Sequence, residues 1–197
     1  MKLIIKFLFP LLLSFSVLAL KPHTATYTLS ASDFDLAEVK IALSKTHDVY
    51  SYTLDAQTEG LVAFFLDYQI RSKSTFVINQ LGLQTKHYQN FERDGKKIKK
   101  DINIYPKNQQ VDSLNQTLAI VNALEKNPAK REFYFLMNDG KSITKKHYHQ
   151  IQSDDDNLIK VVDSKGKLEV YFARDKYYLP VLIRRNKFTY RLKSIQF

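Results

Sequence analysis

The sequence predicts a mainly β fold. We expect a single long, curved antiparallel sheet of roughly 11 strands, a half-barrel or open barrel, with one amphipathic helix packed on it. Apolar and polar residues alternate with a period of two through most of residues 23–197. Short turn-forming segments separate these runs, and only residues 111–128 have a clear helical period. Because a lone helix among strands has to bury its apolar stripe, we expect it against the concave face of the sheet or across one of its mouths.

Four segments carry the alternation most clearly, at residues 36–44, 48–56, 67–78 and 97–105. Each is rich in the β-branched and aromatic residues that favour strands. Side chains two apart on a strand share a face, so each segment predicts one apolar face. These faces consist of Ala37, Val39, Ile41 and Leu43; Tyr50, Tyr52, Leu54 and Ala56; Tyr68, Ile70, Phe76 and Ile78; and Ile98, Ile102 and Ile104.

Turn signals lie between the runs, including Asp-Gly pairs at 94–95 and 139–140 that suit tight hairpins. The last hairpin is predicted to turn at Asn186 and Lys187. This register pairs Ile183 with Tyr190 and directs both toward the core, together with Val181 and Leu192. Arg184, Arg191 and Lys193 of the same hairpin then face outward. The pleat therefore explains the alternating basic and aromatic residues of this stretch without nucleic-acid binding.

The helical segment is "VDSLNQTLAIVNALEKNP", residues 111–128. Ser113 and Gln116 match a capping-box pattern, Asp112 is a second N-cap candidate, and Pro128 is expected to end the helix. The apolar stripe consists of Leu114, Leu118, Val121 and Leu124.

The N-terminal residues predict export. Lys2 and Lys6 precede an apolar run at 7–20, and Val17 and Ala19 suit the positions before a signal-peptidase site. The run is short for a retained membrane anchor, which needs about 20 apolar residues. We therefore predict a signal peptide over 1–19, cleaved after Ala19, one mainly β domain over 20–197, and a periplasmic location without a stable transmembrane anchor.

Cysteine is absent, which excludes disulfides, thiolate metal sites, cysteine nucleophiles and a lipidated cysteine after the apolar run. Removing residues 1–19 lowers the formal charge from +10 to +8, because Lys2 and Lys6 are lost. An exported cationic protein can meet phospholipid head groups or other anionic envelope components. Nucleic acid is not an expected partner, because export separates the protein from it.

We predict no catalytic site, no metal site and no cofactor. His147 and His149 share a strand face, as some zinc ligands do, but no third ligand at a suitable spacing accompanies them. "SDDDN" at 153–157 lacks the glycine and the spaced glutamate of a calcium loop. The S-x-x-K patterns at 142–145 and 164–167 lie in turns or strands rather than at a helix start.

Several stretches together resemble the exported bacterial proteins of domain-of-unknown-function family 3108. They are "HTATYTL", "YSYTLDAQTEGLVAFFLDYQIRSKSTF", "LQTKHYQNFERDGKKIKKDINIY" and "KLEVYFARDKYYLPVLIRR", and they span nearly all of residues 23–197. The most specific pieces are Tyr88 followed by "RDGKK", and "YLP" at 178–180. The chain departs from the family near Leu83 and near Tyr171 or Phe172, where members tend to carry glycine and tryptophan. The resemblance implies a Gram-negative envelope protein of β structure, with no established activity.

A looser similarity in fold connects the chain to periplasmic carriers of lipids and lipoproteins. The first functional hypothesis is therefore a binding or carrier module for an apolar or amphipathic envelope ligand. The alternative is an envelope protein-interaction or scaffold module without a small ligand, and a hydrolase ranks below both. The predicted cavity lining consists of Tyr50, Tyr52, Phe64, Phe65, Phe76, Leu114, Leu118 and Val121, and the predicted basic surface of Arg184, Arg191 and Lys193.

Overall fold

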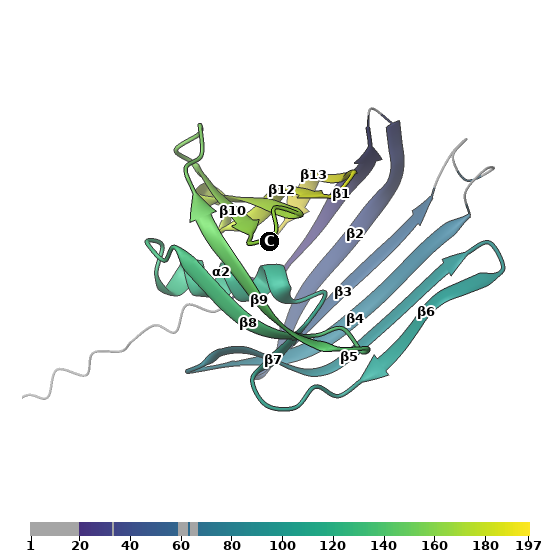
Figure 1. Cartoon of the computed structure of the whole chain (residues 1–197), viewed down its shortest axis with the longest axis horizontal. Helices are drawn as coiled ribbons and strands as arrows, with labels where there is room; N and C mark the ends of the chain where they lie inside the picture. The colour runs from purple at the N-terminus through teal and green to yellow at the C-terminus, as the bar shows by residue number, and fades with distance from the viewer. Residues whose placement is uncertain (1–19, 33, 59–62, 64–66) are drawn as a thin grey trace, which may run out of the picture.

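The computed structural model describes residues 20–32, 34–58, 63 and 67–197. These residues form a 13-stranded sheet, one α-helix and a short 3-10 turn (Figure 1). The elements are β1 (His23–Ala31), β2 (Phe34–Thr46), β3 (Val49–Thr58), β4 (Tyr68–Asn79), β5 (Gly82–Asp94), β6 (Lys97–Ile104), β7 (Gln110–Asp112), α2 (Gln116–Lys126), β8 (Glu132–Asn138), β9 (Ile143–Ile151), β10 (Leu158–Asp163), β11 (Leu168–Ala173), η1 (Arg174–Lys176), β12 (Leu179–Arg185) and β13 (Phe188–Gln196).

The sheet is a meander whose two terminal strands lie side by side. Its order is β6-β5-β4-β3-β2-β1-β13-β12-β11-β10-β9-β8-β7. Every neighbouring pair is antiparallel except β7 with β8, which is parallel. The sequence predicted roughly 11 strands. Part of the difference is β7, a three-residue strand that overlaps the start of the predicted helical segment 111–128 and is too short to show an alternating pattern.

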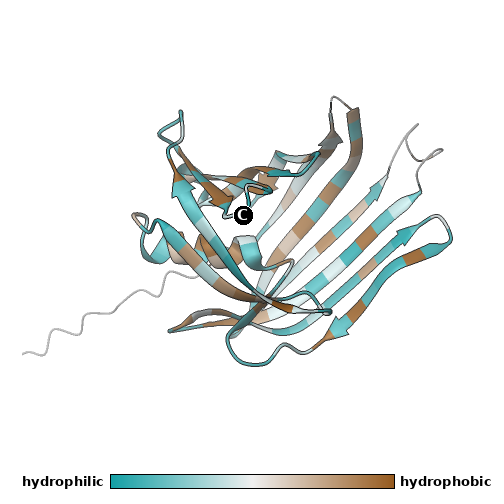
Figure 2. Cartoon of the chain, in the orientation of Figure 1, coloured by the Kyte–Doolittle hydropathy of each residue, from teal (hydrophilic) through white to brown (hydrophobic). Residues whose placement is uncertain are grey.

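The sheet curls around α2, so the predicted mainly β fold with one helix on a curved antiparallel sheet is confirmed (Figure 1). Figure 2 shows apolar and polar residues alternating along the strands. The helix stripe Leu118, Val121 and Leu124 is buried as predicted, whereas Leu114 is only half-buried. Ile120 and Asn122, outside that stripe, are buried as well. The enclosing sheet therefore buries more of the helix than an amphipathic pattern requires.

The two ends of the sheet approach each other. The turn between β8 and β9 reaches β6: a Cβ added to Gly140 would lie 2.6 Å from Cγ2 of Ile102. At the opposite edge, Asp112 of β7 donates its backbone N–H to Thr85 Oγ1 of β5 over 3.0 Å. These two contacts draw the 13 strands toward a barrel without hydrogen bonding the edge strands to each other.

The register of the last hairpin is confirmed. Leu182 pairs with Arg191, Ile183 with Tyr190, Arg184 with Thr189 and Arg185 with Phe188. Asn186 adopts a φ of 54°, as a tight hairpin turn requires. Ile183, Tyr190 and Leu192 pack against the core as expected.

The predicted capping box is wrong. The helix begins at Gln116, and its N-cap residue Asn115 makes no side-chain capping hydrogen bond. Ser113 Oγ instead pairs with the Tyr88 hydroxyl over 2.7 Å, and Gln116 Nε2 donates to the Ser113 carbonyl oxygen. Asp112 performs the related task, because its Oδ1 accepts the backbone N–H groups of Leu114 and Asn115. The hydrogen bond between Ser113 and Tyr88 is a tertiary contact that the local sequence could not reveal.

Asp112 also ties the start of the helix to the sheet. Its second oxygen, Oδ2, accepts hydrogen bonds from Ser74, Thr85 and the Asn115 side chain. Burial raises the pKa of the Asp112 carboxyl, although these hydrogen bonds favour its charged form. The cluster therefore stabilises the junction of β4, β5 and α2 through five donors to one buried carboxyl group.

Candidate ligand-binding cleft

A cleft of about 480 Å³ occupies part of the concave side of the sheet. Its apolar lining comes from neighbouring strands and from the approach to α2, because side chains two apart on each strand point to this side. The volume lies within the range of roughly 300–1,000 Å³ that small-molecule sites occupy. The apolar lining includes Leu29, Val39, Leu54, Ala56, Ile70 and Leu114.

Hydrogen-bonded polar groups form the wall of the cleft. The Tyr148 hydroxyl donates to Gln116 Oε1 over 2.6 Å, and the Tyr88 hydroxyl pairs with Ser113. Burial raises the pKa of Tyr88 and of Tyr148 to about 12, so both phenols stay neutral at physiological pH. The wall can therefore present hydroxyl groups without adding negative charge.

Glu92 is the acidic member of this wall. It accepts hydrogen bonds from Lys100, Tyr68 and Asn90, at 2.6, 3.0 and 3.0 Å. Burial opposes its ionisation, but these hydrogen bonds and the positive charge of Lys100 outweigh burial and lower the pKa of Glu92. The charges of Glu92 and Lys100 therefore compensate each other within the cleft.

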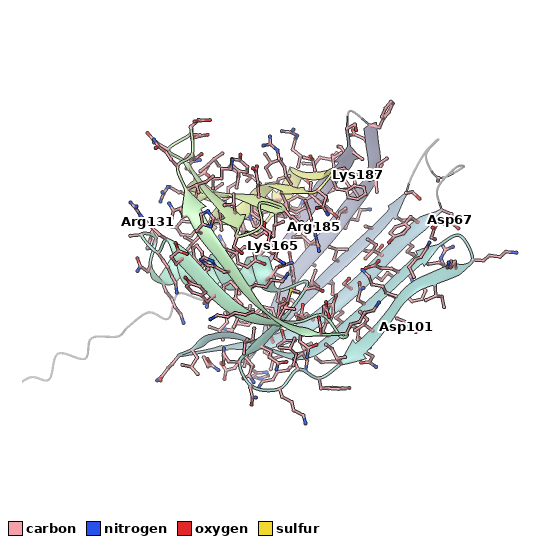
Figure 3. All side chains as sticks on the ribbon, viewed as in Figure 1. Asp67, Asp101, Arg131, Lys165, Arg185 and Lys187 are labelled. Atoms are coloured by element: carbon pink, nitrogen blue, oxygen red, sulfur yellow. The ribbon has the colours of Figure 1, made fainter. Side chains whose placement is uncertain are left out.

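The mouth of the cleft is basic. Its lining contains six cationic and three acidic side chains, an excess of three positive charges. Lys100 pairs with Glu92, but the other five cations form no ion pair within the described part of the chain. Two of them, Lys165 and Arg185, lie close together in Figure 3. The five are Lys141, Lys146, Lys165, Lys167 and Arg185.

The other two acids of the lining are turned toward backbone groups. Asp139 Oδ1 accepts the backbone N–H groups of Lys141 and Ser142, at 2.9 and 2.8 Å. Asp163 Oδ1 accepts those of Lys167 and Leu168, at 2.6 and 2.8 Å. Both carboxylates thus stabilise turns through backbone hydrogen bonds. The five unpaired cations therefore remain available to an anionic group at the mouth.

Of the predicted lining residues, Leu114 borders this cleft. Tyr50, Tyr52 and Phe76 lie instead in the packed core, where the Tyr50 and Phe76 rings stack with centroids 5.0 Å apart and planes 8° from parallel. Leu118 and Val121 are buried beside a much smaller cavity near residue 20. Phe64 and Phe65 lie outside the described residues. A ligand contact for the predicted set remains a prediction.

The alternation pattern had already placed Leu54, Ala56 and Ile70 on an apolar face, but it could not distinguish the packed part of that face from the open part. Tyr50 and Leu54 lie on the same face of β3, yet only Leu54 lines the cleft. Lys165 lies in the turn before β11 and Arg185 ends β12, both far from β3 in sequence, and no local pattern joined them to it.

The predicted basic surface is largely neutralised. Arg184 pairs with Glu169 at 3.3 Å and lies 5.6 Å from the centroid of the Tyr171 ring. Lys193 pairs with Glu38 at 2.8 Å. Arg191 is exposed on the outer face of β13. The outer face of the hairpin is thus less available to an anionic surface than its sequence suggested.

The histidine pair belongs to a local surface cluster. His147 Nε2 contacts a carboxylate oxygen of Glu132, and its ring stacks on Tyr134 with centroids 4.5 Å apart. His149 lies 6.1 Å from His147 between ring centroids. Within residues 20–32, 34–58, 63 and 67–197, no group of three or more His, Asp or Glu side chains is arranged to hold a metal ion.

No family model matches the chain, and no curated protein matches it. A solved structure does. The chain is similar to the crystal structure of a β-barrel-like protein of domain of unknown function DUF1849 from Brucella abortus. The TM-score is 0.54 at 9% sequence identity, and the match covers 89% of this chain and 97% of that one.

This similarity supports the β-barrel-like fold and a relationship in architecture to a domain of unknown function. It does not show membership of family 3108. At 9% identity it carries no residue roles. No helix within the described residues is both long enough and apolar enough to cross a membrane.

Proposed function

We propose that the protein is a periplasmic binding or carrier module for an amphipathic ligand that joins an apolar chain to an anionic group. The apolar chain lies in the concave cleft, and the anionic group lies at its mouth. The observation that carries the proposal is the combination of an apolar floor with five unpaired cations around one opening of about 480 Å³.

The floor supplies affinity through burial of apolar surface, which contributes about 25 cal/mol for each Å² removed from water. Leu54 and Ile70 are half-buried in the free protein and therefore have surface left to bury against a ligand. Polar groups at the wall are already hydrogen bonded to each other, so an apolar chain leaves few of them unpaired.

The mouth supplies selectivity for negative charge. Lysine and arginine at a partly enclosed site attract anions more strongly than on an open surface, because less water screens them. Arg185 additionally offers a planar fork of donors to a phosphate or carboxylate, whereas Lys165 acts as a compact charge. The proposal assigns no chemical step to the cleft.

The floor is tested with dodecyl phosphate as the probe and calorimetric titration as the measurement. Leu54→Trp places a bulky ring in the cleft and should weaken binding at least about tenfold, a change of about 1.4 kcal/mol. Val49→Trp, on the opposite face of the same strand, is the matched control and should leave binding unchanged. A wild-type protein that does not bind dodecyl phosphate, or equal effects of the two variants, would overturn the proposal.

The cations at the mouth are tested by the same calorimetric titration, carried out with dodecyl phosphate and separately with the uncharged dodecanol. Lys165→Gln combined with Arg185→Gln should weaken dodecyl phosphate binding severalfold while leaving dodecanol binding unchanged. Arg191→Gln, on the outer face, serves as the control. Equal weakening of the binding of both probes would show that the two cations act on structure rather than on the anionic group.

Native mass spectrometry of protein isolated from the periplasm should then reveal a co-purified amphiphile.

A further inference from the structure

A second cavity, separate from the proposed ligand cleft, lies where the described chain begins. It has a volume of about 10 Å³ and lies between residues 20–23, one side of α2 and the C-terminal residue. Its polar lining comes from Lys21, His23, Glu125 and Lys176, and its apolar lining includes Leu20, Leu118, Val121 and Phe197. A space of this size holds about one small polar group.

Two buried acceptor atoms belong to residues of this cavity, and neither has a hydrogen-bond partner among the described residues: Oε2 of Glu125 and Nε2 of His23. The two residues are only 9% and 6% exposed. Nδ1 of His23 lies 2.8 Å from the Lys21 carbonyl oxygen. Because a carbonyl can only accept, Nδ1 carries the hydrogen, and Nε2 of the neutral ring is an acceptor.

Burial shapes the charge of both groups. It lowers the pKa of His23 despite the hydrogen bond to the Lys21 carbonyl, so the ring is neutral near pH 7. It raises the pKa of Glu125 to about 7, and no cation or donor among the described residues compensates the buried carboxylate. Buried acceptors without partners destabilise a fold. A positively charged donor would satisfy both acceptors and neutralise the Glu125 carboxylate.

The lysines of the lining are engaged elsewhere. Lys21 Nζ donates to the Tyr177 hydroxyl over 3.0 Å and lies 4.2 and 4.5 Å from the ring centroids of Tyr177 and Phe197. Lys176 Nζ pairs with Asp175 at 3.0 Å. Neither amine is therefore placed to satisfy Glu125 or His23.

Leu20 lines the same cavity and is only 2% exposed. It is also the first residue after the predicted cleavage site. Hydrolysis of the Ala19–Leu20 peptide bond by a signal peptidase consumes one water. The carboxylate stays on Ala19 of the leader, and the new amine of Leu20 takes up a proton, since α-amino groups have a pKa of about 7.8. One amide N–H thus becomes three N–H donors with a positive charge.

We propose that this cavity is the binding site for the chain's own processed N-terminus, with the α-ammonium of Leu20 donating to the Glu125 carboxylate and to His23 Nε2. Leader removal then completes a buried ion pair that the precursor lacks. The pair links the start of β1 to the end of α2, so the folded state becomes more stable once the leader is gone. The inference depends on cleavage after Ala19 and is independent of the ligand cleft.

The test compares two chains that differ by one residue: one begins at Leu20 and the other keeps Ala19, which displaces the amine by about 3.8 Å. Each is prepared with Glu125 and with Glu125→Gln, a substitution of equal shape. The chain beginning at Leu20 should melt higher by on the order of 5 °C at pH 7, and Glu125→Gln should abolish the difference. Equal melting temperatures, or a difference that survives in Glu125→Gln, would overturn the proposal.

A chemical measurement tests the same contact independently of stability. Amine-reactive labelling of Leu20 in the native protein should be at least about tenfold slower with Glu125 than with Glu125→Gln, because a paired, buried ammonium is a poor nucleophile. Equal labelling rates would mean that a water or no group occupies the cavity. N-terminal sequencing of protein recovered from the periplasm should begin at Leu20, and any other first residue would also refute the inference.

Discussion

The substitution Phe76→Ala tests whether the interior next to the cleft is packed. Phe76 is 0% exposed and its ring stacks on Tyr50. A buried phenylalanine removes about 200 Å² from water, equivalent to about 5 kcal/mol at 25 cal/mol for each Å². Alanine retains part of this burial, while the lost stacking and the new cavity add to the cost, so we expect a loss of about 4 kcal/mol in the free energy of unfolding.

The assay is equilibrium urea unfolding followed by circular dichroism, with thermal melting as a second measure. A loss of about 4 kcal/mol corresponds to a melting temperature lower by about 12 °C for a domain of this size. Phe34→Ala is the matched control, because Phe34 is 72% exposed and its removal should change stability by less than about 0.5 kcal/mol. A loss below about 1 kcal/mol for Phe76→Ala would refute the reasoning and indicate that its ring borders open space.

Two further substitutions test the junctions of the sheet, each measured by urea unfolding. Asp112→Ala leaves five donors without their acceptor and should cost roughly 3 kcal/mol, whereas Asp101→Ala on the exposed face of β6 should cost almost nothing; similar losses would argue against a role of the buried cluster in anchoring α2. Gly140→Ala should destabilise more than Gly95→Ala, although both glycines have positive φ, because only at Gly140 would the new Cβ collide with Ile102. Equal losses would mean that the β8–β9 turn does not press on β6 in solution.

Much of the architecture was predictable because hairpins are local. The register from Leu182–Arg191 to Arg185–Phe188 follows from the alternation and from one turn, and the structure reproduces it. The helical stripe was likewise visible at Leu118, Val121 and Leu124. The capping prediction at Ser113 failed because Tyr88, 25 residues earlier in the chain, takes its hydroxyl group.

The candidate site was less predictable. The predicted lining consisted largely of aromatic residues. Tyr50 and Phe76 instead pack against each other in the core, and aliphatic residues such as Leu54 line the cleft. The predicted basic surface used outward cations, and Arg184 proved to be paired with Glu169, whereas Arg185 borders the cleft and has no acidic partner among the described residues. Neighbouring residues on a strand point to opposite faces, so the alternation separated these two arginines, but it could not show that Glu169 pairs with one and that the other borders a cleft.

The sequence by itself determined the fold class, the hairpin order and the inward face of most strands, because these depend on turns and on a period of two between near neighbours. Only the tertiary structure decided where the inward face is filled and where it is open, because that depends on how far the sheet curls and on contacts between distant segments. Pairing of β1 with β13 and the approach of Gly140 to Ile102 join residues far apart in the chain. The same curvature brings Lys165 and Arg185 to the cleft that Leu54 lines, and it places Leu20 beside the same small cavity as Glu125.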